Sequence, residues 1–589
     1  MIYDKKLLDI LEKYNVGVLS DEKLNENFEC IIIDALSRKC NNKVCAIWGA
    51  GQNNTKSSHA AILITKYATF IQNMVCVIDS NPELQGKSFL GYPIIAPKQM
   101  DEFGIEVVII ASKNSGDSIK KNLLSIKPQC SYVDIYGELR AKGIEVYQNF
   151  YDENSLYTQI FENKESYLIN KNEKNLLDLI SLHFSIRDLY YAEKYIREYI
   201  ELKFNQYQKY EKLLIEIEEL LREMKDKSVN KTDDISLFYI DALRAKDVFN
   251  LEDGKSRIFN SYAKHAKLFL NIYSTAVTTY ESMMSVITGK YPLETEVYVN
   301  DFLHDLEDFE LLSEYRRKGY ELNFMVSDCY KIIKDTNRIN FNLQVYMAQK
   351  LWTLACQIAE SQKPTFNFVY FPYETHFPLL CGFHKEKPVI KAFSDLGINE
   401  FPERIEKQYK ECVDYTDKQF EFFYELFGRK TIKVIFSDHS QVVYDKENCN
   451  KTYNMYYRYK ELTTHVPLIV SKEGWNNEIK SSLFSMIDFN KIVNKLIKNN
   501  DVKDLSKDII RYQYYPMHNP KMREHAKEFG FTDYIEGMDI FMSDELIYVQ
   551  TATGMKEVYR LDNLQENLCD TETGLQFINE VEKNYKVAF

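Results

Sequence analysis

Residues 235–247, ISLFYIDALRAKD, decide how the longer part of this chain folds. The run ISLFYI is continuously apolar and predicts a buried strand. Asp241 follows it directly. A lone Asp at a strand end is usually a turn or cap residue, but ligands of open α/β sheets also gather at the carboxyl ends of strands. The stretch therefore predicts a strand-based domain and leaves two roles open for Asp241.

Similar apolar runs recur further along the chain, separated by helical segments. They are FNFVYFPY at 366–373, IKVIFSDHS at 432–440 and VPLIVS at 466–471. This pattern predicts an α/β domain over residues 231–589.

Polar groups stand where these strands end. Asp438 and His439 follow one run, and His376 follows another. Asp438 and His439 alone could be a capped turn. Together with Asp241 they make two carboxylates and an imidazole, which suits a divalent metal, and an alcohol oxygen could complete the set. Thr278 or Thr279, in TTYESMMSVITGKYP, could supply that oxygen, and either could instead be only a helix cap.

The first 150 residues carry a second strand pattern. VCAIWGAG at 44–51, MVCVIDSNP at 74–82 and EVVIIAS at 106–112 alternate with helical spacing. This order predicts right-handed crossovers and a small parallel, Rossmann-like sheet over residues 1–150. Residues 151–230 show helical periodicity and predict a connector.

Composition and charge argue against several classes of protein. With 87 acidic against 74 basic side chains the formal charge is −13, and no basic patch favours a nucleic-acid partner. Eleven cysteines without a C-x-x-C spacing favour reduced thiols. Neither a signal peptide nor an apolar run near the ~18 residues of a membrane helix is found, so a soluble, cytoplasmic protein is expected. The oligomeric state stays open.

Five stretches occur in the order typical of one family. These are FYIDALRAKD, TGKYP at 288–292, VIFSDHS, THVPLIV and ELIYVQTATGMKEVYRLDNLQEN at 545–567. In this order they resemble the sulfatase branch of the alkaline phosphatase superfamily over residues 235–589. The resemblance implies that Asp241, Asp438 and His439 bind one divalent ion, Zn²⁺, Mn²⁺ or Mg²⁺.

The nucleophile position carries the main departure from that family. Counting ten residues back from Gly289, as the family spacing requires, gives Thr279. Sulfatases carry Cys or Ser there, converted to formylglycine within Cys-x-Pro-x-Arg. A threonine cannot become the aldehyde, but it resembles the nucleophile of phosphoethanolamine transferases and lipoteichoic acid synthases. In such an enzyme Thr279 would also be a metal ligand.

The resemblance therefore implies a phosphotransferase with a phosphothreonine intermediate. The donor would be a phosphoethanolamine- or phosphoglycerol-type ester, and the acceptor a glycan of cell-surface polysaccharide assembly. Two alternatives remain: a phosphate or sulfate ester hydrolase, and a binding module whose catalysis has decayed.

Two histidines and an arginine have weaker assignments. His376 resembles the family's mid-chain histidine, which contacts phosphate or protonates the leaving group; a surface loop histidine is the alternative. His465 is a lesser candidate for the same work. Arg244 could reach phosphate, although a structural salt bridge is the more usual role.

The first domain resembles nucleotide-sugar-modifying and CoA-binding-like Rossmann domains, through IWGAGQNNTKS and IDSNPELQGKSFLGYPI. The resemblance implies a nucleotide or nucleotide-sugar site in which Gly49 and Gly51 approach the phosphates and Asp79 contacts the ribose. The third glycine of G-x-G-x-x-G is missing, so a scaffolding or partner-binding role is the alternative.

Overall fold

The computed structural model describes most of the chain. The residues described are 1–18, 21–49, 60, 63–64, 67–112, 116–141, 156–295, 305–326, 340–343, 346–376, 379, 381, 383–386, 402–441, 463–516, 523, 527, 530 and 532–589.

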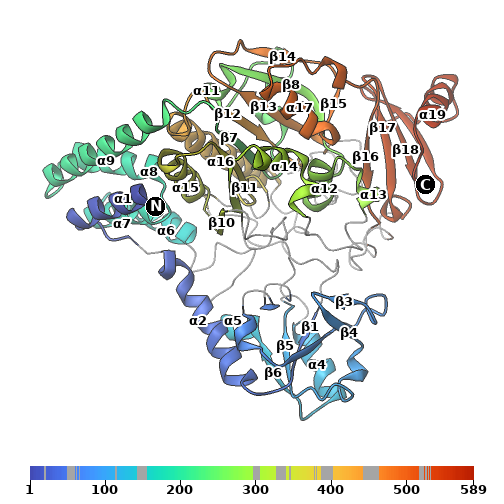
Figure 1. The fold of residues 1–589 in the computed structure, drawn as a ribbon, viewed down its shortest axis with the longest axis horizontal. Coiled ribbons are helices and arrows are strands. Elements are labelled where there is room, and N and C mark those ends of the chain that lie inside the picture. Colours follow the sequence, from blue (N-terminus) through green and yellow to red (C-terminus); the bar gives the residue numbers. More distant parts are fainter. Residues whose placement is uncertain are drawn as a thin grey trace.

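A six-stranded sheet forms the first domain (Figure 1). Its strands run in the order β3-β4-β2-β1-β5-β6, and all neighbours are parallel except β3 and β4. Because the chain winds outward from β1 in both directions, the predicted Rossmann-like parallel sheet is confirmed. The elements are β1 (Cys45–Trp48), β2 (Met74–Ile78), β3 (Ser88–Phe89), β4 (Tyr92–Ile95), β5 (Val107–Ile110), β6 (Ser131–Asp134), α2 (Asp21–Cys40), α4 (Gly116–Ile126) and α5 (Ile135–Arg140).

A layer of helices follows, as the periodicity of residues 151–230 predicts. It consists of α6 (Leu156–Asn170), α7 (Glu173–Ser185), α8 (Leu189–Glu201) and α9 (Tyr207–Ser228).

The first helix, α1 (Ile2–Lys13), packs with this layer rather than with the six-stranded sheet. Its Asp4 accepts hydrogen bonds from Arg187 and, at 2.8 Å, from the Trp352 indole. The strand pattern that predicts a domain over residues 1–150 does not indicate where α1 packs.

A nine-stranded sheet forms the core of the rest of the chain. Its order is β10-β9-β11-β7-β12-β13-β8-β14, with β15 paired to β8. The strands from β10 to β12 are parallel, and β13 runs against its neighbours β12 and β8. The strands are β7 (Ile235–Ile240), β8 (Ala266–Tyr273), β9 (Glu321–Val326), β10 (Asn340–Leu343), β11 (Thr365–Phe371), β12 (Ile432–Phe436), β13 (His465–Ser471), β14 (Glu478–Lys480) and β15 (Phe484–Ser485).

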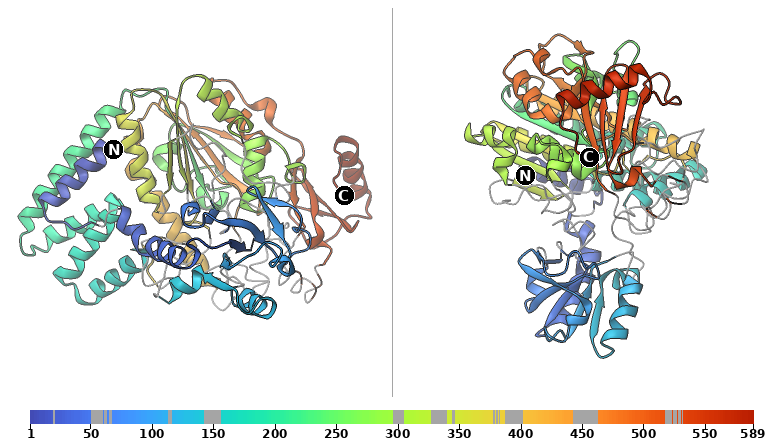
Figure 2. Two further views of the ribbon diagram at one scale, coloured as in Figure 1. Left: turned by 60° about the horizontal axis from the view of Figure 1, so that its bottom comes forward. Right: turned by 90° about the vertical axis from the view of Figure 1, so that its right-hand side faces the viewer.

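Helices cover both faces of this sheet (Figures 1 and 2). Alternate residues of β7 point to opposite faces, so Phe238 and Ile240 enter one apolar core while Leu237 and Tyr239 enter the other. The first core joins α15, α16 and the helical layer, and the second joins α12, α14 and α17. The helices are α10 (Ala245–Val248), α11 (Asn260–Ala263), α12 (Thr279–Thr288), α13 (Pro292–Thr295), α14 (Glu310–Arg317), α15 (Met347–Glu360), α16 (Pro402–Phe423) and α17 (Phe489–Ile497).

The chain ends in a separate four-stranded antiparallel sheet, which the sequence pattern did not distinguish from the α/β domain. It lies on the side of the molecule opposite the helical layer (Figure 1). No helix among the described residues is long and apolar enough to cross a membrane. The elements are β16 (Ile510–Tyr514), β17 (Met538–Met542), β18 (Leu546–Thr551), β19 (Lys556–Arg560) and α19 (Glu572–Asn584).

Candidate active site

Three neighbouring parallel strands bring the candidate ligands to one edge of the large sheet. Asp241 follows β7, Asp438 and His439 follow β12, and His376 follows β11. Because β11, β7 and β12 lie side by side and point the same way, their carboxyl ends meet. The ligand atoms of Asp241, His376 and His439 all lie within 4.8 Å of one another. Residues separated by nearly 200 positions thus share one site.

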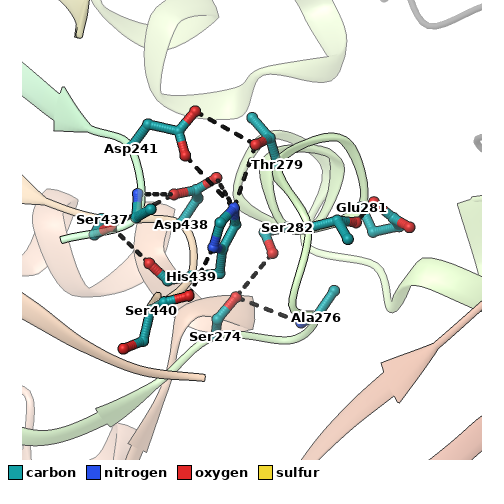
Figure 3. Close-up of polar contacts among 12 residues, drawn as sticks. Asp241, Ser274, Ala276, Thr279, Glu281, Ser282, Ser437, Asp438, His439 and Ser440 are labelled. Atoms are coloured by element: carbon teal, nitrogen blue, oxygen red, sulfur yellow. Dashed lines mark hydrogen bonds and ion pairs between the residues drawn. The ribbon is translucent and has the colours of Figure 1, made fainter. Parts of the chain in front are cut away.

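The two threonines have different places at the start of α12. Thr278 has extended backbone angles, occupies the N-cap position, and its hydroxyl donates to the Glu281 carboxylate. Thr279 is the first helical residue, and its side chain points toward the acidic edge of the sheet (Figure 3). Its Oγ1 lies 3.4 Å from Asp241 Oδ2 and 3.3 Å from His439 Nε2. The N-cap position and the candidate nucleophile therefore fall on different residues, and the Thr278 side chain makes no capping hydrogen bond.

The helix that carries Thr279 is short and sharply ended. Gly289 closes it with a left-handed φ of +65°, a conformation that costs glycine little. At its other end the first-turn N–H groups lack helical partners and carry the positive end of the helix dipole. A negatively charged group beside Thr279 would be stabilised there.

His439 is oriented by its own neighbour in the chain. Its Nδ1 lies 2.9 Å from the Ser440 carbonyl oxygen, which can only accept, so Nδ1 carries the proton. Nε2 then faces the carboxylates, 3.5 Å from Asp241 Oδ1 and 3.5 Å from Asp438 Oδ2. This is how ligating histidines are usually held, with the second nitrogen donating to a fixed oxygen.

Two tyrosines that the sequence analysis did not identify hold the carboxylates. Tyr370 donates to Asp241 Oδ2 at 2.5 Å, and Tyr239 donates to Asp438 Oδ2 at 2.6 Å. They are register partners on β11 and β7, with ring centroids 4.4 Å apart. Asp438 also accepts from the Ala242 amide. The available signal was strand alternation, which places Tyr239 and Tyr370 on one face.

The site has the electrostatic features of a cation site. Asp241 is 1 % exposed, and burial together with the charge of Asp438 raises its pKa. Its Oδ1 is buried and makes no hydrogen bond with any described residue. A divalent ion would offset both carboxylate charges and satisfy that oxygen, so the predicted ligands Asp241, Asp438, His439 and Thr279 fit such an ion. His376, predicted to contact substrate, is also placed as a possible ligand.

His465, the lesser catalytic candidate, is held within the sheet. Its Nε2 lies 2.7 Å from the Leu270 carbonyl oxygen, and its ring stacks on Tyr273. Burial lowers its pKa. Among the described residues it makes no hydrogen bond with Thr279 or Asp241, so the structure gives it a packing role and does not place it with the catalytic candidates.

Arg244 is held in a structural salt bridge, the more usual of the two roles considered for it. Its guanidinium donates to both oxygens of Glu406, at 2.8 and 2.7 Å, and lies 4.1 Å from the Tyr409 ring centroid.

The candidate nucleotide residues of the first domain are engaged locally or fall outside the described residues. Gly49 ends β1 with a φ of +110°, and its amide donates to the Ile78 carbonyl. Asp79 Oδ1 accepts a hydrogen bond of 2.8 Å from the backbone N–H of Asn81, and this bond closes a turn. Gly51 lies outside the described residues. Nucleotide binding by Gly49, Gly51 and Asp79 stays a prediction.

Comparisons with known proteins agree with this architecture. Residues 237–502 match the family model described as Sulfatase, and residues 41–131 match the one described as C2185-like, N-terminal. A search of curated proteins found no match.

Several solved structures are similar to this chain at low identity. The phosphonate monoester hydrolase of Agrobacterium radiobacter is 12 % identical, with 60 % of this chain and 95 % of that chain covered and a TM-score of 0.43. A 2-O GAG sulfatase is 12 % identical, with 60 % of this chain and 91 % of that chain covered and a TM-score of 0.44. The phosphonate monoester hydrolase of Silicibacter pomeroyi is 13 % identical, with 60 % of this chain and 96 % of that chain covered and a TM-score of 0.38.

Sulfatase-family proteins typically bind a divalent metal, and the buried Asp241, His376 and His439 group lies inside the matched segment. Residues 237–502 are therefore similar to sulfatases, and the C2185-like match that precedes them, over residues 41–131, contains most of the first parallel sheet.

Proposed function

We propose that this protein is a metal-dependent enzyme that cleaves phospho-alcohol esters through Thr279, with water completing the cycle. One observation carries the proposal: Thr279 Oγ1 lies at a helix N-terminus between Asp241 Oδ2 and His439 Nε2, at 3.4 and 3.3 Å. A free threonine hydroxyl is a poor nucleophile, so it needs both a charge that stabilises its alkoxide and an acceptor for its proton. This position offers both.

Asp241, Asp438 and His439 would hold the divalent ion, with His376 as a further ligand or as a substrate contact. When bound, the ion supplies Lewis acidity, which stabilises the threonine alkoxide and offsets charge on the phosphoryl group. The tyrosines at 239 and 370 keep the two carboxylates aimed at the site.

The reaction has two displacements at phosphorus. In the first, the Thr279 hydroxyl loses its proton to Asp241 Oδ2, the Oγ1–P bond forms, and the P–O bond to the leaving alcohol breaks. The leaving alkoxide takes up a proton, for which His376 is the candidate donor. In the second, water attacks phosphorus and gives its proton to His376, the Oγ1–P bond breaks, and the Thr279 alkoxide takes back the proton held by Asp241, which restores the site and releases the phosphate product. The first-turn N–H groups of α12 stabilise the phosphoryl charge in both steps.

Transfer to an acceptor alcohol is the second candidate. It is favoured by the threonine itself, which resembles the nucleophile of phosphoethanolamine transferases and lipoteichoic acid synthases. In a transferase an acceptor hydroxyl, for example of a glycan, replaces water in the second displacement. Sulfate ester hydrolysis is disfavoured because threonine cannot form the formylglycine aldehyde.

Intact-mass spectrometry after exposure to a phosphodiester tests the common first step. Bis(4-nitrophenyl) phosphate, 4-nitrophenyl phosphate and 4-nitrophenyl sulfate, each with Zn²⁺, Mn²⁺ or Mg²⁺, report the ester class. We expect turnover of a phosphate ester and a phosphoryl adduct that maps to Thr279. Turnover of the sulfate alone, or an adduct elsewhere, would contradict the proposal.

Acceptor dependence separates the two candidates. A hydrolase releases product at the same rate with and without added glycan or glycerol, whereas a transferase forms a new ester that mass spectrometry detects.

A further inference from the structure

A second cluster of possible metal ligands lies at the apolar core that joins α15, α16 and the helical layer. Cys381 and His384 follow β11, and Cys412 lies on α16. All three are buried, and their ligand atoms lie within 4.8 Å of one another. Cys412 Sγ is 3.8 Å from His384 Nε2. We propose that Cys381, His384 and Cys412 bind a zinc ion, separate from the ion of the Asp241 and His439 site.

The chemistry of the three groups selects the metal. Two sulfurs and one imidazole nitrogen are soft or intermediate donors, which favour Zn²⁺ over Mg²⁺, Mn²⁺ or Ca²⁺. Two thiolates and a neutral imidazole also balance the charge of the dication, so the complex is neutral. A neutral complex can be wholly buried at little electrostatic cost, whereas an isolated charge cannot.

His384 has the surroundings of a metal-bound histidine. Its Nδ1 lies 3.1 Å from Glu411 Oε2, so a proton on Nδ1 leaves Nε2 on the side of the two sulfurs. A carboxylate that receives the second ring nitrogen is the usual support for a ligating histidine.

An arrangement without metal competes for the same atoms. His384 Nε2 also lies 2.8 Å from the Leu379 carbonyl oxygen. A doubly protonated ring could donate to Leu379 and Glu411 at once, beside a thiolate. This arrangement and the zinc site differ in bound metal and in sulfur chemistry, so they can be distinguished directly.

The position of the cluster indicates what the ion would do. Cys381 lies five residues after His376, and Cys412 lies in the middle of α16. The segment is also held by the helical layer, since the Lys164 ammonium contacts the His384 carbonyl and Tyr191 stacks on Phe383 with centroids 4.6 Å apart. A zinc ion would join the chain that presents His376 to α16, and so fix that edge of the active site.

Metal content of the full-length protein tests the proposal. The double variant Asp241→Asn/His439→Ala removes ligands of the active-site ion, so zinc left in it reports the second site alone. We expect about one zinc per chain in this variant after purification with reductant and zinc, and none after Cys412→Ala is added. Cys356→Ala is the matched control, because Cys356 is a buried cysteine of α15 in the same apolar core, outside the cluster.

Cobalt substitution identifies the ligands. In the double variant Co²⁺ should give thiolate-to-cobalt charge-transfer absorption in the near ultraviolet, which Cys412→Ala abolishes and Cys356→Ala retains. If Cys412→Ala does not fold, Cys412→His keeps a nitrogen ligand and should retain metal with weaker sulfur absorption.

Three results would overturn the proposal. These are a double variant that binds no zinc after supplementation, a cobalt spectrum that Cys412→His leaves unchanged, and an intact mass showing a Cys381–Cys412 disulfide in the reductant-purified protein. None of them bears on phosphoester turnover by Thr279, so the second site and the proposed function fail independently.

Discussion

The two large sheets of this protein, six-stranded and nine-stranded, both place acidic residues at the ends of parallel strands, but these residues have different roles. In the six-stranded sheet Asp79 follows β2 and accepts the amide of Asn81, two residues further on. In the nine-stranded sheet Asp241 follows β7 and meets side chains from β12 and α12. Asp79 is partly exposed and closes a turn, whereas Asp241 is buried and keeps one oxygen without a hydrogen bond to any described residue.

The difference shows that an acidic residue at a strand end does not form a site by itself. What distinguishes Asp241 is convergence: three adjacent parallel strands deliver polar groups to one place, and local backbone cannot satisfy them all. A buried carboxylate left in this state favours a cation, because an uncompensated buried charge is costly. Substitutions at the two acids and their partners can test this contrast.

The largest effect is expected at the nucleophile. Thr279→Ala should lower phosphoester turnover by roughly 10³-fold or more, because no covalent intermediate can form. Steady-state kinetics and intact mass measure the change. Thr278→Ala is the control: it removes only the hydroxyl bond to Glu281, so turnover should stay within about tenfold. Equal losses in the two variants would contradict the assignment of Thr279.

The next effect is at the acid that anchors the ion. Asp241→Asn should lower turnover by roughly 10²-fold or more and weaken metal binding, since the charge opposite the ion is halved. Calorimetric titration of chelator-treated protein with Zn²⁺ or Mn²⁺ measures affinity. Asp234→Asn is a matched control, because Asp234 is also buried but lies before β7 and accepts from Thr365. Retained metal affinity in Asp241→Asn would place the ion elsewhere.

A smaller effect is expected at the tyrosine behind that acid. Tyr370→Phe removes the hydrogen bond to Asp241 Oδ2 and should lower metal affinity or turnover by about 10–100-fold. Tyr315→Phe serves as control, since the buried Tyr315 hydroxyl makes no hydrogen bond with the described residues of the same core. A loss of thermal stability without any change in metal affinity would show that Tyr370 only packs.

The smallest effect on catalysis is expected in the first sheet. Asp79→Ala should leave phosphoester turnover unchanged and destabilise the first domain by about 0.5–1.5 kcal/mol, through the lost bond to Asn81. Thermal unfolding and the turnover assay together test this. If Asp79→Ala lowers turnover as Asp241→Asn does, the two strand ends are functionally linked and the contrast between them does not hold.

Most of the fold could be predicted because hydrophobic patterning is local. The runs at 235–240, 366–371 and 432–436 are strands, and the strand patterns of the first domain pair as a parallel sheet. Hydrophobic patterning does not predict which elements pack against one another. Helix α1 joins the connector because its buried residues complete that core, and nothing in its own sequence names the partner.

The candidate site was predictable where a motif carried it, and not elsewhere. Thr279, Asp241, Asp438 and His439 lie together as their motifs indicate. His465 was the lesser of two histidine candidates in sequence, and the structure places His376 with the acids and holds His465 against Leu270. Cys381, His384 and Cys412 were missed because the third ligand comes from a different element, 28 residues after His384.

The sequence alone determined the α/β class. Apolar runs define strands through local periodicity, and a threonine at position 279 cannot become formylglycine whatever the fold. Only the tertiary structure decided which threonine faces the acids, which histidine joins them, and which tyrosines hold them. These depend on strand order and side-chain direction, and both are set by long-range packing that no short stretch of sequence contains.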